Sequence, residues 1–239
     1  MRTSCQIVDQ SCALSSPATH QFPPARGRSI LDLRKLLAER FPQASCPPNA
    51  RLATGIPPLD ELTGGGLPRG AITEITASQR SAGSALLICA LLQAACEDRS
   101  FLALIDGRDS FDPQPLGDER LRHLLWVRCR TAMDAVKSAD LLLRDGNFQL
   151  IILDLVLNRA EELQKIPQSS WYRLQRLVEP VPAAFLVLTH RGMIASAQVK
   201  LVLENRWTLG DLARDYSAAR WSMRVQRMHS GRQQMAEVG

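Results

Sequence analysis

The sequence predicts an α/β fold with a mainly parallel central sheet flanked by helices. Apolar segments of strand length alternate with segments of helical periodicity, and most of these strand segments are apolar at nearly every position. Strands buried on both faces have this composition, whereas strands with one solvent-facing side alternate polar and apolar residues. The expected strands are 101–106, 121–127, 148–153 and 184–188, and the expected helices 132–143 and 171–178. Segments 199–207 and 220–228 are mostly alternating or β-branched, which predicts terminal antiparallel strands.

Composition limits the choice of class and compartment. The chain has 239 residues, 45% of them hydrophobic, which allows one large domain with an appendage or two small ones. No apolar run is as long as a membrane span, and the N-terminus lacks the pattern of a signal peptide, so we expect a cytoplasmic protein. The six cysteines form no Cys-x-x-Cys pair and are expected to be reduced. The net charge of +5 is compatible with nucleic acid without requiring it.

Four segments are expected along the chain. Residues 1–28 are rich in Ser, Pro, Thr and Gln and are expected to form a disordered leader. Residues 29–50 are expected to form an N-terminal docking helix and a linker, because apolar side chains recur there at helical spacing until Pro42. Residues 51–230 form the expected core domain, and residues 231–239 a flexible tail.

The loop after the segment 71–75 has the layout of a phosphate-binding P-loop without its residues. Strand, small-residue loop and helix follow one another as in P-loop sites. Such a loop begins with Gly and ends with Gly-Lys-Ser/Thr, which together hold the phosphates and Mg²⁺. Here Ala77 and Ala82 replace the two glycines, Gly83 occupies the lysine position, and only Ser84 is retained. The charge that would hold a triphosphate is absent.

Few candidate nucleotide-binding residues remain. They are Arg80, Ser81, Gly83 and Ser84 of the loop, and Asp154 at the end of an apolar strand. Arg80 could return some charge to the loop, but it precedes the lysine position by three residues. We therefore expect no cofactor and no catalytic residue, and binding of ATP and Mg²⁺ is the alternative.

The order of these landmarks resembles the RecA core over roughly residues 51 to 230. The resemblance rests on Thr54-Gly55 to Leu59-Asp60, Gly64 to Gly70, Ile72-Thr73-Glu74-Ile75, Ile105 to Pro113, Ile151 to Asp154 and Leu188-Thr189-His190. It implies a RecA-like P-loop NTPase core, with Asp154 as the Walker B carboxylate. The segment after Asp106 would hold the catalytic glutamate, and the segment at His190 would sense the γ-phosphate.

Departures from the RecA pattern argue against hydrolysis. Arg108 stands where the resemblance places the glutamate, and a guanidinium cannot accept a proton from water. Gly83 stands in the lysine position and His190 replaces a glutamine. Phosphoryl transfer depends on electrostatic stabilisation and on positioning of the nucleophile, and both contributions are lost here. The sequence therefore predicts a pseudo-ATPase.

The two segments that correspond to RecA's DNA-binding loops are short or charge-balanced. Residues 191–198 replace a long Gly-rich loop, and residues 155–167 carry acidic as well as basic side chains. Neither has the interleaved basic and aromatic residues of a platform for stacking bases. We expect weak or indirect DNA binding.

Within the RecA-like group, the broken P-loop, the helix segment Trp171 to Leu177 and the Arg/Val-rich C-terminal segment resemble ImuA-type proteins. The resemblance implies an accessory factor in SOS-induced translesion DNA synthesis. It implies an ImuB-like Y-family polymerase homologue and a specialised DNA polymerase as partners, and RecA as a further candidate. Two alternatives stay open: a DNA-dependent ATPase of the recombinase type, and a SulA-like inhibitor of cell division.

Two groups of residues are candidates for binding partners. Phe41 and Ala44 match the Phe-x-x-Ala pattern by which RecA-like recombinases dock onto a neighbouring subunit, which makes a homo-oligomer an open alternative. The other interpretation is that Phe41 packs on its own helix. Arg220, Arg224 and Arg227 could bind phosphate or an acidic partner, or could line a solvated face.

Overall fold

A computed structural model describes residues 47, 49–77, 79, 82–205 and 221–228. The chain divides into two units, Met1–Gln43 and Ala44–Gly239, and the description concerns the second. The predicted leader, the docking helix with Phe41 and Ala44, and the tail at residues 231–239 lie outside the described residues.

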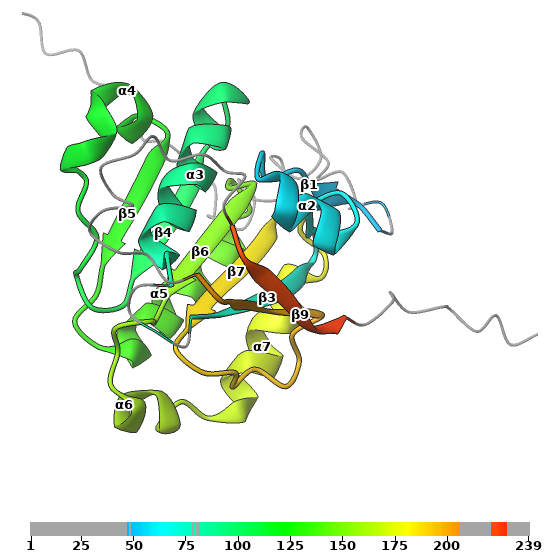
Figure 1. Ribbon diagram of the computed structural model, residues 1–239. Coiled ribbons are helices and arrows are strands. Elements are labelled where there is room, and N and C mark those ends of the chain that lie inside the picture. Colours follow the sequence, from blue (N-terminus) through cyan, green and yellow to red (C-terminus); the bar gives the residue numbers. More distant parts are fainter. Residues whose placement is uncertain (1–46, 48, 78, 80–81, 206–220, 229–239) are drawn as a thin grey trace, which may run out of the picture. The chain divides into compact units, whose positions relative to one another are not determined.

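The predicted α/β fold with a mostly parallel central sheet is confirmed. Seven strands lie in the order β5-β4-β6-β7-β3-β8-β9 (Figure 1). Their bounds are β3 Ala71–Ala77, β4 Leu102–Asp106, β5 Leu124–Arg128, β6 Leu150–Asp154, β7 Ala184–Thr189, β8 Val199–Leu203 and β9 Met223–Met228. The predicted antiparallel pairing is correct for β8 with β9, but β8 itself runs parallel to β3 and extends the main sheet.

Helices cover both faces of this sheet. They are α2 Pro57–Thr63, α3 Ser84–Glu97, α4 Gly117–Leu121, α5 Ala132–Asp145, α6 Ala160–Gln164 and α7 Gln168–Val178, with a 3₁₀ turn at Gln114–Leu116. The prediction missed α4, α6 and a small sheet formed by β1 (Arg51–Leu52) and β2 (Leu67–Pro68). It also began the third strand at Leu121, which is the last residue of α4.

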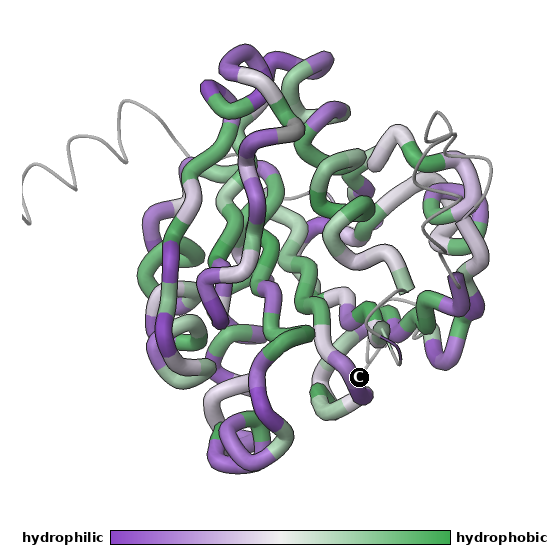
Figure 2. The backbone as a smooth tube through the Cα atoms, turned by 60° about the vertical axis from the view of Figure 1, so that its left-hand side comes forward, coloured by the Kyte–Doolittle hydropathy of each residue, from purple (hydrophilic) through white to green (hydrophobic). Residues whose placement is uncertain are grey.

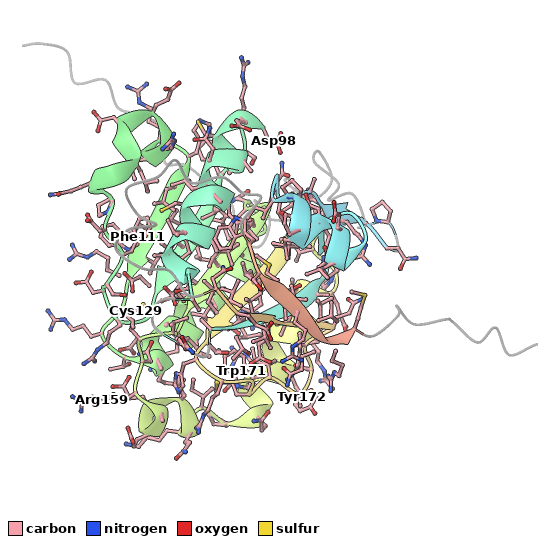
Figure 3. All side chains as sticks on the ribbon, viewed as in Figure 1. Asp98, Phe111, Cys129, Arg159, Trp171 and Tyr172 are labelled. Carbon is pink, nitrogen blue, oxygen red and sulfur yellow. The ribbon has the colours of Figure 1, made fainter. Side chains whose placement is uncertain are left out.

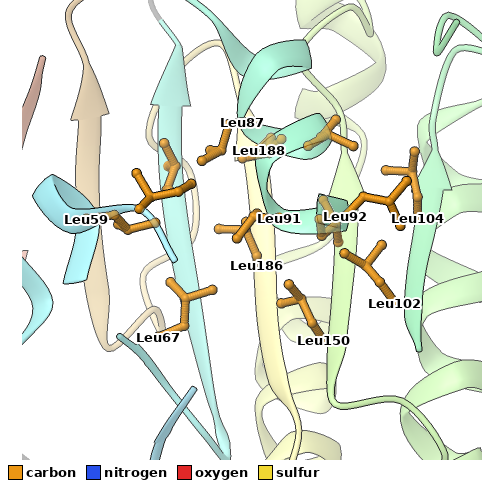
Figure 4. Close-up of a cluster of buried hydrophobic side chains, with 14 of the residues drawn as sticks. Leu59, Leu67, Leu87, Leu91, Leu92, Leu102, Leu104, Leu150, Leu186 and Leu188 are labelled. Atoms are coloured by element: carbon orange, nitrogen blue, oxygen red, sulfur yellow. The ribbon is translucent and has the colours of Figure 1, made fainter. Parts of the chain in front are cut away.

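A leucine-rich core lies between α3 and the sheet. Leu87, Leu91 and Leu92 of α3 pack with Leu59 of α2 and with strand leucines, as Figure 4 shows. Each of these side chains is at most 5% exposed, and full burial of a leucine contributes about 2 kcal/mol. α3 carries few polar residues because α3 is the main helical cover of this face of the sheet.

A second core lies on the opposite face, beneath α5 and α7. Trp171 of α7 is fully buried there, with Leu174 and Val178 on the same side of the helix. Trp171 is therefore a core residue and is not available to anchor a partner. Figure 2 shows hydrophobic segments along the strands and hydrophilic segments mainly in the outer connections.

The charge of the described part is balanced. It contains as many acidic as basic residues, so the surplus of +5 lies entirely in residues outside it. None of the helices in this part is long and apolar enough to cross a membrane. The described surface therefore has no net positive charge with which to attract a nucleic acid.

Candidate functional site

A cavity of about 230 Å³ lies where β3, β6 and β7 end. These three strands are neighbours in the sheet and run parallel, so their carboxyl ends meet at one edge. Ligands of open α/β sheets bind at this edge. The cavity is lined by Ala77, Gln79, Val156, Leu157, Asn158, Arg159, Ala160 and His190. Arg159 lies just before α6, at the outer side of the structure in Figure 3.

The loop between β3 and α3 is described only in part, since Arg80 and Ser81 lie outside the described residues. Gly83, at the lysine position, has a left-handed backbone (φ 96°, ψ 23°) and caps α3 without a side chain. Ser84 is the first residue of the helix. Asn205, which follows β8, donates from Nδ2 to the Ala82 carbonyl at 3.1 Å and so holds the end of the loop. A lysine at position 83 would be strained in this conformation.

Asp106, at the end of β4, uses its carboxylate to shape the next loop. It accepts the backbone N–H groups of Arg108, Ser110 and Phe111 at 3.1, 2.7 and 2.8 Å, and it is 1% exposed. Three donors satisfy a buried carboxylate well. The described residues contain no group of three ligands that could hold a metal ion.

Arg108 is held on the outer side of this loop by an ion pair. Its guanidinium lies 3.7 Å from the Glu162 carboxylate of α6. Asn158 links the same elements, because its Nδ2 donates to the Gly107 carbonyl at 2.9 Å and to Glu162 Oε2 at 3.0 Å. The hydrogen bond from the amide of Asn158, and to a smaller extent the charge of Arg108, hold the pKa of Glu162 below its ordinary value. The loops after β4 and β6 are thus joined beside the cavity.

Asp154 ends β6, directly opposite Asp106 in the register. Burial raises the pKa of Asp154 from its ordinary 3.8 to about 6, the nearby Asp106 adds to this rise, and the N–H of Val156 opposes it. A carboxylate with this pKa is partly protonated near pH 6 and is costly to ionise in the fold.

We expect Asp154→Asn to stabilise the protein above pH 6 and to leave it unchanged below pH 4. Between 3.8 and about 6 the folded state holds a proton that the unfolded state has lost, so stability falls as the pH rises through this window. The cost of the ionised form is at most about 3 kcal/mol, and we expect a gain of about 1–3 kcal/mol. Urea denaturation at pH 4 and pH 7.5 measures this change in the free energy of unfolding.

The matched control is Asp106→Asn. An amide has a single acceptor oxygen and cannot replace the carboxylate for three N–H donors, so this variant is expected to be less stable at pH 7.5. Equal stability of Asp154→Asn and the wild type at both pH values would contradict the role of burial at Asp154.

The cavity can accommodate a small polar ligand. Its described lining contains the cation Arg159 and the imidazole of His190, and no carboxylate. Asn158 is 3% exposed and its Oδ1 has no hydrogen-bond partner among the described residues. Among the described lining residues, His190 has an imidazole that could accept a proton, and none has a carboxylate of the kind that commonly holds Mg²⁺.

The predicted partner-binding arginines have different surroundings. Arg220 lies outside the described residues. Arg224 of β9 is exposed and pairs with Glu204 at 2.8 Å. Arg227 donates to the carbonyls of Ala195 and Ala197, so it holds the segment after β7 in place. Of the two arginines that the structure describes, Arg224 is the more accessible to a partner.

Gln79, Asn158 and Asn205 were not among the predicted site residues. Asn158 lies four residues after Asp154 in the sequence, and this short distance weakly indicated that it is near the end of the same strand. Nothing in the sequence around Gln79 or Asn205 predicts that they lie near the cavity or its loop, because their positions depend on the order of the strands in the sheet. His190, at the position where the resemblance to RecA implies a γ-phosphate sensor, lies in the cavity wall.

The fold and this site define a class of protein: a mostly parallel α/β sheet with a loop and cavity at its carboxyl edge, consistent with a RecA-like core. The chain is weakly similar to RecA proteins. It is 34% identical to Protein RecA of Clavibacter michiganensis subsp. michiganensis over 113 residues, which cover 46% of this chain and 31% of that protein.

Two other RecA proteins give similar values. Protein RecA of Chlorobaculum tepidum is 32% identical over 109 residues, or 44% of this chain and 31% of the relative. Protein RecA of Leifsonia xyli subsp. xyli is 36% identical over 107 residues, or 43% of this chain and 29% of the relative. The chain thus spans about a third of the length of these relatives. No protein-family profile matches it.

Proposed function

We propose that this chain is a RecA-like accessory factor that has lost nucleotide turnover and acts through protein contacts in SOS-induced translesion DNA synthesis, as ImuA-type proteins do. Its partners would be an ImuB-like Y-family polymerase homologue and a specialised DNA polymerase. RecA is a third candidate, and contact with DNA would be weak or indirect.

The main support for the proposal is the position and pairing of Arg108. At the position where a RecA-like core would place its catalytic base, this chain has a cation paired with Glu162. The residue at the lysine position, Gly83, has a backbone that disfavours a side chain. The described cavity lining adds no carboxylate. These features support the loss of ATP hydrolysis. Because the fold is retained, we infer that the protein acts through contacts made by its surface.

The first test is phosphate release from ATP·Mg²⁺ in the presence of single-stranded DNA. We expect no more release than in the protein-free reaction, and no difference between the wild type and Arg80→Ala. Phosphate release that Arg80→Ala abolishes would overturn the proposal in favour of a DNA-dependent ATPase. Equilibrium binding of a fluorescent ATP analogue, measured in parallel, shows whether nucleotide binds without being cleaved.

The second test is capture of the polymerase homologue by tagged full-length chain. We expect Arg224→Glu to reduce capture at least fivefold, because Arg224 is exposed and its substitution reverses a charge. Arg176→Glu, on the exposed side of α7, is the matched control and should have no effect. If no partner is captured and overproduction blocks septation, the division-inhibitor alternative is correct.

A further inference from the structure

The connection from β7 to β8, residues 190–198, contains no helix or strand. It runs from the carboxyl edge of the sheet back to the amino edge, because β7 and β8 are both parallel to β3. Connections without regular structure usually lie on the surface and are mobile. Here Ile194 and Ala197 have no exposed surface and belong to the core beneath α5 and α7. The connection is therefore a packed part of the molecule.

Glu74 of β3 holds the first half of this connection. The side chain of Glu74 is fully buried, and its Oε1 accepts the backbone N–H groups of Met193 and Ile194 at 2.7 and 3.2 Å. The hydroxyl of Thr189, the last residue of β7, donates to the same oxygen at 3.4 Å. His190 lies between these anchor points, so Glu74 fixes the chain on both sides of the histidine that lines the cavity.

Arg227 of β9 holds the second half. Its guanidinium donates to the carbonyls of Ala195 and Ala197 at 2.6 and 3.2 Å. The N–H of Ala197 in turn donates to the Ile194 carbonyl at 3.3 Å, which links the two halves of the connection. A guanidinium presents several donors in a rigid planar arrangement, so one arginine can hold two carbonyls at once.

Lys200 of β8 joins the two anchors. It pairs with Glu74 at 2.9 Å, and in the strand register it is the neighbour of Arg227. Within the described residues, β9 is the last strand on this side of the sheet and pairs with β8 alone (Figure 1). A strand with one neighbour is held by fewer contacts than a central strand and opens locally more readily. One anchor of the connection therefore depends on an end strand of the sheet.

We propose that Glu74, Lys200 and Arg227 form a relay through which the state of β9 sets the position of His190 in the cavity wall. While β9 is in place, Glu74 and Arg227 keep the connection packed and the histidine fixed. When β9 is displaced, Arg227 leaves the two carbonyls, the connection loosens as far as Met193, and His190 leaves the wall. Because such coupling is reciprocal, a molecule that displaces His190 also weakens the hold on β9. The relay does not depend on the function proposed above.

The test is NMR of the full chain, without any partner, carrying Arg227→Met. This substitution keeps an apolar stem in place and removes the donors to both carbonyls. Amide exchange is expected to become at least tenfold faster at Ala197 and at Met193, because local opening exposes these N–H groups. The ring signals of His190 are expected to shift toward those of an exposed histidine. The ring of His123, which precedes β5 at the other side of the sheet, is the internal reference and should not shift.

Arg224→Met is the matched control on the same strand. Arg224 is exposed and pairs with Glu204, so this variant should change the exchange rates less than twofold. Arg227→Lys keeps the charge without the planar fork, so it should have an intermediate effect, and it replaces Arg227→Met if that variant does not fold. Denaturation midpoints show which variants are folded. Faster exchange at Ala197 with an unchanged His190 ring, no effect of a folded Arg227 variant, or an equal effect of Arg224→Met would overturn the proposal.

Discussion

Replacement of Lys200 by methionine is expected to lower the free energy of unfolding by about 3–5 kcal/mol. Glu74 lies in the middle of β3 with no exposed surface, and Lys200 faces it from β8 at 2.9 Å. Without Lys200 the carboxylate keeps only neutral donors, chiefly the N–H groups of Met193 and Ile194. A buried charge without its counterion is strongly destabilising. Urea denaturation at pH 7 measures the change.

A double substitution isolates the charge effect. Glu74→Gln combined with Lys200→Met removes both charges, and we expect it to recover at least half of the loss. Lys137→Met is the control, since the Lys137–Asp134 pair is largely exposed and its loss should barely move the midpoint. If Lys200→Met were as stable as the wild type, the ion pair would not stabilise the fold.

Gly66→Ala is expected to cost about 3 kcal/mol or more. An added Cβ would lie 2.1 Å from the Leu52 carbonyl oxygen and 2.8 Å from the Ala53 nitrogen, at a φ of +122°. These are backbone atoms of β1 and of the residue that follows it, so they cannot move aside without separating β1 from β2. Leu67, the fully buried residue that follows, would then lose part of its packing. Thermal and urea denaturation both measure this.

Gly64→Ala shows how much of that cost is steric. Gly64 also has a left-handed backbone (φ +71°), but an added Cβ would meet nothing within 4 Å. We expect a loss of about 1–2 kcal/mol from backbone strain alone. Equal losses for the two variants would mean that β1 moves freely away from Gly66.

Much of the architecture was predictable because the signals are local. Mostly apolar segments such as 148–153 indicate strands covered on both faces, and the structure has such a strand at Leu150–Asp154. The helix at Ala132–Asp145 followed from its periodicity and from Gly146, which ends it in a left-handed conformation. Short elements such as α6 were missed because five residues carry no detectable period.

For the site, the sequence indicated departures from the RecA pattern but not the residues that come together. Gly83 and Arg108 are abnormal at positions that can be counted from the surrounding pattern. The side chains that line the cavity were not predictable, since Gln79, Asn158 and His190 meet only after three strands align. The sequence also could not distinguish Arg224 from Arg227. In the structure Arg224 is exposed, whereas Arg227 donates to backbone carbonyls.

The sequence by itself predicted the longer helices, most strands of the main sheet and their order, and it places Gly83 and Arg108 where the resemblance to RecA puts a lysine and a glutamate. These depend on residues close together in the chain, through hydrophobic period and motif spacing. Only the tertiary structure decided that Glu74 pairs with Lys200, that Trp171 is buried, and that β5 ends the sheet with its outer edge unpaired among the described residues. The reason is that these contacts depend on the order of the strands in the sheet. That order brings together residues far apart in the sequence, such as Ala82 and Asn205, which are 123 residues apart.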